Sequence, residues 1–268
     1  MQMAIDVRGH GAPLVLVGGG LSGWLTWIPH QEMLAPTRRV ARAQPVNVQL
    51  GLENRPLPPD YSVKLESAAL ASALDAAGFA GFADIVAWSY GAMIALDYAL
   101  DHPDRVRTLT LIEPPAVWVL AETGQLDAQS EGELDRLHEL HRGMHGDVTE
   151  DQLADFLVQV GIAPSHLNVR LLPLWPNWVR HRRSLRQGEA IFAHHDRAAR
   201  LRSFGRPTLL FKGTGGSHLF HRITDVLGAT LPNARVVELP GGHAPQLAAT
   251  GEFLRILSDF QASAVVAV

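Results

Sequence analysis

A serine stands at the junction of two apolar segments, and a serine in that position can act as a nucleophile. The stretch 85–88, Ile-Val-Ala-Trp, predicts a buried strand, and from Tyr90 onward apolar residues recur every three to four positions, as in a helix. Almost no residues remain for a loop, so the chain must turn sharply at Ser89 and expose its hydroxyl above the sheet. The neighbours Ala87 and Gly91 are small, as such a turn requires.

This pattern resembles the nucleophile elbow of the α/β-hydrolase-fold serine hydrolases. Residues 87–91, Ala-Trp-Ser-Tyr-Gly, match the small-x-Ser-x-small motif of that family. The family usually has glycine where this chain has Ala87, which is the next smallest residue. The resemblance extends over essentially the whole chain, and it implies a hydrolase that needs no cofactor and activates Ser89 with a histidine and an acid.

The resemblance places the base at His243, in the loop after the last predicted strand. A lone serine is a poor nucleophile and needs a base within hydrogen-bonding reach. Of the 13 histidines, His243 has the expected context, behind the two glycines that end the stretch 234–242. The glycines would let this loop reach back over the sheet.

The acid departs from the usual family pattern. The family most often carries an aspartate after the strand predicted at 206–213, but residues 214–218 contain no carboxylate. Some members take the acid from the end of the strand after that of the nucleophile, where this chain has Glu113. The carboxyl ends of adjacent parallel strands share one edge of a sheet, which favours Glu113. A Ser-His pair without an acid, and Asp225 as the acid, are the alternatives.

Two backbone amides are expected to hold a developing oxyanion. The helix that follows the nucleophile points its N-terminus at the site, so the amide of Tyr90 is one donor. The resemblance places the second donor in the loop 18–20, where the family commonly has His-Gly-x and this chain has Gly18 instead of the histidine. We assign the second amide to Gly20, with Leu21 as the alternative.

Apolar side chains around the predicted site indicate an apolar substrate. The candidate substrate contacts are Leu21, Trp24, Trp88, Trp175 and Trp178. The last two belong to the segment 116–202, whose aromatic side chains could form a lid over the serine. The alternative is that they only pack this segment onto the rest of the protein.

Three histidines share one predicted helical face and so raise the question of a metal site. His138, His141 and His145 lie three and four residues apart. No carboxylate-rich surroundings accompany them, as a metal site with its supporting ligands would require. We therefore expect a solvent-exposed helix and no metal ion.

Strand-like apolar runs alternate with helical patterns, which indicates the α/β class with a mostly parallel sheet flanked by helices. Strands are expected within 12–20, 38–50, 83–89, 106–114, 206–213 and 234–242, and helices at 26–35, 62–77, 91–101, 218–230 and 247–261. From 116 to 202 the alternation gives way to helical patterns, with caps expected at Ser130 and Thr149. The expected organisation is an α/β-hydrolase core of 1–115 and 203–268 with a helical cap domain of 116–202.

The composition fits a soluble, globular, intracellular protein. The 268 residues contain no cysteine and carry a net charge of −4 with the signs intermixed, which provides no basic surface for nucleic acid or membrane. No apolar run approaches the roughly 20 residues of a membrane helix, and residues 1–10 lack the apolar run of a signal peptide. We expect a cytoplasmic protein with a small-molecule substrate and no nucleic-acid or membrane partner, and the sequence is compatible with a homodimer.

The predicted function is a cofactor-free serine hydrolase that cleaves an ester, lactone or related acyl bond of a small, apolar substrate. Ser89 would attack the carbonyl, His243 would take its proton and Glu113 would orient the histidine, and water would release the acyl-enzyme. The same fold also hosts lyases and carbon–carbon bond hydrolases, which form one alternative. A ligand-binding or degenerate non-enzyme is another, motivated by Gly18 and by the missing aspartate.

Overall fold

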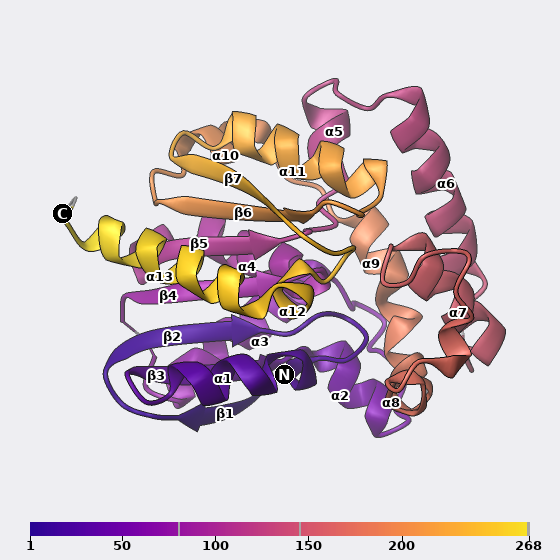
Figure 1. Cartoon of the computed structure of the whole chain (residues 1–268), viewed down its shortest axis with the longest axis horizontal. Helices are drawn as coiled ribbons and strands as arrows, with labels where there is room; N and C mark the ends of the chain where they lie inside the picture. The colour runs from indigo at the N-terminus through magenta and orange to yellow at the C-terminus, as the bar shows by residue number, and fades with distance from the viewer. Residues whose placement is uncertain (80, 145, 267–268) are drawn as a thin grey trace.

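The computed structural model describes residues 1–79, 81–144 and 146–266, and a β-sheet forms its centre (Figure 1). Within these residues the sheet has seven strands in the order β1-β3-β2-β4-β5-β6-β7. The strands are β1 (Ala4–Arg8), β2 (Ala12–Val17), β3 (Arg38–Gln44), β4 (Ala83–Trp88), β5 (Val106–Ile112), β6 (Thr208–Gly213) and β7 (Ala234–Leu239). β1 runs antiparallel to β3, and the other neighbouring strands are parallel. The predicted α/β class is confirmed.

Helices connect the strands. The α-helices are α1 (Ile28–Leu34), α2 (Val46–Leu52), α3 (Val63–Ala76), α4 (Tyr90–Asp101), α5 (Trp118–Glu122), α6 (Ala128–Arg142), α7 (Glu150–Gln159), α8 (Trp175–His181), α9 (Gly188–Ala193), α10 (Ala198–Ser203), α11 (His218–Thr230), α12 (Pro245–Ala248) and α13 (Thr250–Val266). The 3₁₀ helices are η1 (Trp24–Trp27), η2 (Pro103–Arg105), η3 (Val169–Leu171) and η4 (Arg182–Gln187). In the part of the chain that the structure describes, no helix combines the length and apolar character needed to cross a bilayer.

The two faces of the sheet carry two apolar cores, because successive side chains of a strand point to opposite faces. In β2, Leu14 and Leu16 pack in the core that contains Phe253 of α13, and Val15 and Val17 pack in the core that lies against α4. In Figure 1, α13 lies in front of the sheet and α4 lies behind it. Both faces are covered, which explains why the central strands are nearly continuous apolar runs.

The sequence-based prediction differs from the structure at a few elements. β1 is missing from the prediction, because its five residues are half-buried or exposed at the edge of the sheet and the charged Asp6 and Arg8 interrupt the short apolar pattern. The stretch 38–50 contains a helix as well as a strand: β3 ends before Pro45, and α2 follows directly. The predicted helix 247–261 is divided into α12 and α13.

One of the two predicted helix caps in the segment 116–202 is wrong. α6 begins one turn earlier than expected, and the side chain of Asp127 accepts from the backbone N–H of Ser130 at 2.8 Å. Ser130 is therefore a buried residue of the first turn and not the cap. Thr149 does cap α7, through a reciprocal pair of hydrogen bonds with Gln152.

The described residues between β5 and β6 form helices α5 to α10 and no strand. In Figure 1 the arrows of β2, β5 and β6 point toward α6, α7 and α8, which lie together at the right. η4 packs against α2, and α6 packs against α11. Leu21, in the loop after β2, joins Leu153, Leu157 and Trp178 in a third apolar cluster. The inserted helices therefore lie over the carboxyl ends of the strands.

Candidate active site

Ser89 is the single residue between β4 and α4. Trp88 ends the strand and Tyr90 begins the helix, so the predicted sharp turn is present. Ser89 has φ 55° and ψ −127°, a sparsely populated conformation for a residue with a side chain. Its backbone N–H donates to Ile112 O at 2.9 Å, and its carbonyl accepts from Ala92 N at 2.8 Å. These contacts with β5 and α4 hold the strained turn in place.

The residues two positions before and after Ser89 must be small, as the motif requires. A Cβ atom on Gly91 would lie 2.2 Å from the carbonyl oxygen of Gly18, so no side chain fits there. Ala87 is completely buried in the sheet. The first turn of α4 thus packs directly on the backbone of the loop after β2.

The structure brings Ser89, His243 and Glu113 into one hydrogen-bonded chain. His243 Nε2 lies 2.8 Å from Ser89 Oγ, and His243 Nδ1 lies 3.2 Å from Glu113 Oε2. The other carboxylate oxygen of Glu113 accepts from the backbone N–H of Gly213 at 2.8 Å. A carboxylate beside Nδ1 holds the hydrogen on that nitrogen, so Nε2 is free to accept the serine proton.

Glu113 reaches His243 because it follows β5, which lies between β4, the strand that ends before Ser89, and β6. Its backbone N–H donates to Phe211 O in β6 at 3.0 Å, which extends the parallel pairing to the end of the strand. Asp225, the alternative acid, is half-exposed and pairs with Lys212 Nζ at 2.7 Å. Among the described contacts of His243, the carboxylate is that of Glu113.

The loop that carries His243 is held by both the core and the inserted helices. The backbone N–H of His243 donates to Gly161 O at 2.9 Å, and the indole N–H of Trp88 donates to His243 O at 2.6 Å. The ring of Phe220 lies 4.4 Å from the imidazole, between centroids. A Cβ atom on Gly242 would lie 2.0 Å from Gly161 O, so this glycine is required for the approach.

Gly20 and Tyr90, the predicted oxyanion donors, lie side by side. A Cβ atom on Gly20 would lie 3.1 Å from the Cβ atom of Tyr90, and both residues line the same cavity as Ser89. Asn47 Nδ2 donates to the carbonyl of Gly20 at 2.7 Å and holds the loop on α2. Leu21, the alternative donor, lines this cavity as well.

Glu66 is a buried carboxylate that sequence reasoning missed. It supports the loop of Gly20 through Asn47, and Tyr90 through Tyr61. Glu66 is completely buried and accepts from the backbone N–H groups of Val46 (2.8 Å) and Asn47 (2.9 Å). It also accepts from Tyr61 OH at 2.6 Å, and that hydroxyl lies 2.9 Å from Tyr90 OH. Burial raises the pKa of the Glu66 carboxyl to about 7, against the opposing effect of these donors.

The raised pKa of Glu66 predicts a pH-dependent contribution to stability. The folded protein binds this proton up to about pH 7, whereas the ordinary pKa of a glutamate carboxyl is 4.5. Stability is therefore lost as the pH rises from about 4.5 through 7, by an amount on the order of 3 kcal/mol. Denaturant unfolding at several pH values should show this loss in the wild type relative to Glu66→Gln. The exposed Glu53→Gln should behave like the wild type, and equal pH slopes in all three proteins would contradict the assignment.

Ser89 and His243 open into a mainly apolar cavity of about 60 Å³. This is several times the space that one water molecule needs, so it suits a small substrate. Leu21, Trp88 and Trp178, all predicted substrate contacts, line it. Trp178 comes from α8, so the inserted helices contribute part of the wall.

The other two predicted substrate contacts lie elsewhere. Trp24 packs under the guanidinium of Arg42, 5.7 Å from the ring centroid, at the start of η1. Trp175 packs beside Arg170 at 5.8 Å and against the apolar cluster of the inserted helices. Neither side chain is among the described residues that line the cavity. Trp24 and Trp175 therefore pack against neighbouring side chains and do not contact the cavity.

The histidines of α6 differ from the expected exposed face. His141 is 5% exposed and lines the cavity. His138 is half-exposed: its ring lies 4.5 Å from that of Phe192, between centroids, and its Nε2 lies 3.7 Å from a carboxylate oxygen of Glu189. His145 lies outside the described residues. No cluster of three or more metal-binding side chains occurs in the described ranges. The expectation of a solvated face is therefore wrong for His141, because α6 packs that side against Phe156 and Phe192.

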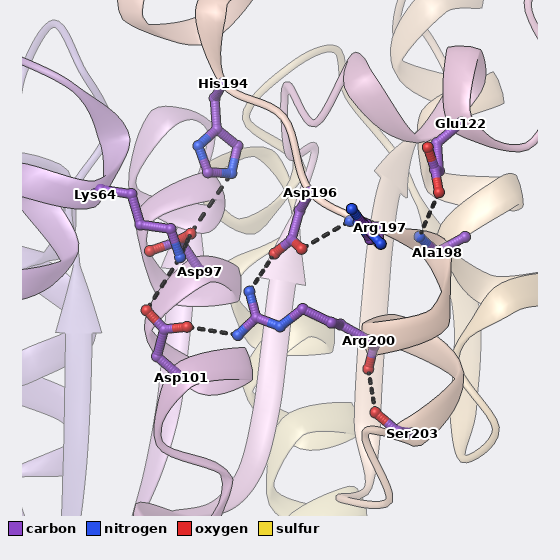
Figure 2. A network of polar contacts seen from close by, with 10 residues as sticks. All are labelled: Lys64, Asp97, Asp101, Glu122, His194, Asp196, Arg197, Ala198, Arg200 and Ser203. Atoms are coloured by element: carbon purple, nitrogen blue, oxygen red, sulfur yellow. Dashed lines mark hydrogen bonds and ion pairs between the residues drawn. The ribbon is translucent and has the colours of Figure 1, made fainter.

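A polar network behind α4 joins the inserted helices to the core (Figure 2). Asp97 of α4 is completely buried, and Lys64 Nζ of α3 lies 2.8 Å from it and 3.0 Å from Asp101. His194 follows α9 and places Nε2 3.6 Å from Asp97, and Arg200 of α10 pairs with Asp101. Burial lowers the pKa of His194. The network anchors the end of the segment on α4, the helix that follows Ser89.

Comparison with known sequences gives both family and relatives. A model of the alpha/beta hydrolase fold family matches residues 13–159. The chain is 28% identical over 267 residues to a putative carbamate hydrolase RutD of Klebsiella pneumoniae (strain 342), with 93% of this chain and 91% of the relative covered. It is 32% identical over 164 residues to 2-hydroxymuconate semialdehyde hydrolase of Pseudomonas sp. (strain CF600), with 58% and 56% covered.

Solved structures show the same architecture. An alpha/beta hydrolase from Sphaerobacter thermophilus DSM 20745 is 27% identical, with a TM-score of 0.66 and 89% of each chain covered. An esterase from Exiguobacterium antarcticum superposes with a TM-score of 0.76 over 97% of this chain and 95% of its own at 16% identity, which bears on the fold alone.

The family match spans more than half of the chain and includes both the turn at Ser89 and the end of β5. The sheet order, the inserted helices and the relatives named as hydrolases agree with it. This chain therefore belongs to the alpha/beta hydrolase fold family and is an enzyme of the hydrolase type.

Proposed function

We propose that this enzyme is a serine hydrolase that cleaves an ester, lactone or related acyl bond of a small, mainly apolar substrate. The observation that carries the proposal is the chain of hydrogen bonds from Ser89 Oγ through His243 to Glu113, at the wall of an apolar cavity. A serine, a base and an orienting acid in this order form a nucleophile for acyl transfer.

The geometry supports the following sequence of steps. Ser89 Oγ attacks the substrate carbonyl while His243 Nε2 takes its proton and then passes it to the leaving group. The amides of Gly20 and Tyr90 hold the oxyanion of the tetrahedral intermediate. A water molecule then attacks the acyl group on Ser89, again with His243 as the base, and releases the acid. The Glu113 carboxylate stabilises the imidazolium that forms.

The inserted helices fit the role of a cap. Trp178 of α8 contributes to the wall of the cavity, and Gly161, which follows α7, accepts from the backbone of His243. We propose that residues 116–202 form a cap domain that shields the acyl-enzyme from bulk water.

The cavity lining favours an uncharged substrate. Among the described residues that line it there is no lysine, arginine, aspartate or glutamate. Burying an ionised group without a partner is strongly unfavourable. The relative named as a carbamate hydrolase supports an acyl bond of the carbamate kind within this class.

Hydrolysis of a carbon–carbon bond by the same residues is a second candidate, because one relative is named 2-hydroxymuconate semialdehyde hydrolase. Its substrate name contains a carboxylate, and the cavity of this chain has no cation in its described lining. The acyl-bond reaction is therefore the better supported of the two.

Intact mass of the wild-type protein tests the proposal. A small fluorophosphonate should add once, and peptide mapping should place the adduct on Ser89. Samples quenched during turnover of p-nitrophenyl butyrate and of a p-nitrophenyl carbamate should each carry the matching acyl group. Absence of any fluorophosphonate adduct would exclude the serine nucleophile, and turnover of a carbon–carbon substrate alone would select the second candidate.

A further inference from the structure

Trp88, the residue directly before Ser89, is tied to the main chain of His243. Its indole N–H donates to the carbonyl oxygen of His243 at 2.6 Å, in a buried contact. In the described part of the chain, this indole is the donor that reaches that carbonyl. The sequence predicts Trp88 as a substrate contact, whereas the structure directs its one polar atom at the main chain of the proposed base.

The indole of Trp88 is packed so that its N–H has a fixed direction. A Cβ atom on Gly19 would lie 2.8 Å from Cε3 of the ring, so the loop after β2 lies directly against the indole. Trp88 is 7% exposed and belongs to the apolar core that contains Phe211 and Leu239. A side chain whose rotamer is locked by packing can hold a second group in place. The donor is therefore oriented before any substrate arrives.

Two adjacent residues at the end of β4 reach the same histidine. Ser89 Oγ lies 2.8 Å from His243 Nε2, and Trp88 Nε1 lies 2.6 Å from His243 O. The side chain and the main chain of His243 are thus referred to one short stretch of the chain. On its other side, the backbone N–H of His243 donates to Gly161 O at 2.9 Å, in the inserted segment. The indole is therefore the contact that ties the backbone of His243 to the strand before Ser89.

We infer that Trp88 is a positioning residue for the reaction, because its indole N–H fixes the main chain of His243 and so keeps Nε2 within hydrogen-bonding distance of Ser89. The inference rests on the proposed serine hydrolysis, in which His243 takes the proton of Ser89. A base must lie about 2.6–3.2 Å from the group that it deprotonates, and a displacement of about 1 Å can lower the rate about 100-fold. Trp88 acts through His243 and has no need to touch the substrate.

Replacement of Trp88 by 3-benzothienylalanine tests the inference, because a sulfur atom then stands in place of the indole N–H while the ring keeps its shape. We expect kcat for p-nitrophenyl butyrate to fall by about 10- to 100-fold. KM should stay within about twofold of the wild-type value, since loss of wall contacts alone would raise KM and leave kcat unchanged. A wild-type kcat in this variant would overturn the inference.

Trp27 provides a matched control for this substitution. Its indole N–H also donates to a backbone carbonyl, that of Val17 at 2.9 Å, and the residue is completely buried. Trp27 is not among the described residues that line the cavity. The same replacement at Trp27 should lower the free energy of unfolding and leave kcat unchanged. An equal loss of kcat in both variants would assign the effect to lost stability and overturn the inference.

Fluorophosphonate labelling separates this inference from the proposed function. The wild type should label, and the 3-benzothienylalanine variant of Trp88 should label at the same serine about 10- to 100-fold more slowly. Labelling of both proteins at one rate would overturn the inference and leave the hydrolase intact. A wild type that neither labels nor hydrolyses any ester would instead reject the proposed function.

The wild-type protein offers an independent measurement if the Trp88 variant fails to fold. With ¹⁵N in tryptophan and ¹³C in the histidine carbonyl, NMR should detect a scalar coupling across the hydrogen bond from Trp88 Nε1 to His243. Among the described hydrogen bonds, this one joins a tryptophan indole to a histidine carbonyl, which identifies the signal. A positioning contact should persist after fluorophosphonate reacts with Ser89. Absence of the coupling in both the free and the labelled protein would overturn the inference.

Discussion

Replacement of Ser89 by alanine is expected to abolish fluorophosphonate labelling and to lower kcat for p-nitrophenyl butyrate about 10⁶-fold. The reason is that Ser89 supplies the atom that forms the bond, and His243 Nε2, at 2.8 Å, has no other described hydroxyl to deprotonate. In the proposed mechanism the three groups act as a unit, so loss of Ser89 would remove nearly all of their effect. The rate that remains would come from the oxyanion donors and from binding.

The cavity offers a matched control for this experiment. Ser22 lines the same cavity as Ser89, so Ser22→Ala removes a serine hydroxyl there without removing the proposed nucleophile. It should label at the wild-type rate and keep kcat within a fewfold. Labelling of Ser89→Ala at the wild-type rate would show that another residue is the nucleophile, and the mechanism above would fail.

Glu113→Gln is expected to lower kcat by up to about 10⁴-fold while the protein still folds. The backbone N–H of Gly213 donates to Glu113 Oε1, so the glutamine oxygen should stay at that position. The glutamine NH₂ then faces His243 Nδ1, which must accept. The hydrogen of the neutral ring moves to Nε2, and the histidine can no longer take the proton of Ser89. Rates of fluorophosphonate labelling and of ester turnover measure the loss.

Asp225→Asn is the control for the acid. The Asp225 carboxylate pairs with Lys212 at the surface, so its loss should change labelling by less than twofold. Rapid labelling of Glu113→Gln would mean that Ser89 and His243 act as a pair without a strong acid. Slow labelling of Asp225→Asn, with Glu113→Gln unaffected, would move the acid to α11.

The local parts of the site could be predicted from contiguous residues. The nucleophile turn is one example: a buried strand and a helix separated only by Ser89 leave one way for the chain to turn. Small residues at 87 and 91 follow from the same steric condition, and Gly91 meets it against the carbonyl of Gly18. The placement of Glu113 beside the nucleophile follows from the parallel alignment of β4 and β5.

Other parts depend on contacts between segments far apart in the chain. Glu66 reads as one more polar residue of an amphipathic helix, yet it is completely buried on the N–H groups of α2 and on Tyr61. Trp24 and Trp175 are large apolar side chains of the kind that commonly contact substrates. In the structure their rings pack against Arg42 and Arg170 instead. Side-chain type gives no information about these partners.

The sequence by itself determined the α/β class, the turn at Ser89 and the series of strands from β2 to β7, because these depend on periodicity and on sterics between adjacent residues. The tertiary structure alone decided which side of α6 faces the cavity. His138 and His141 are three residues apart on one helix, and both contact Phe192. Phe156 and Gly188 also pack against His141, which is buried, whereas His138 stays half-exposed. Burial is a property of what surrounds a side chain, and those surroundings come from distant parts of the sequence.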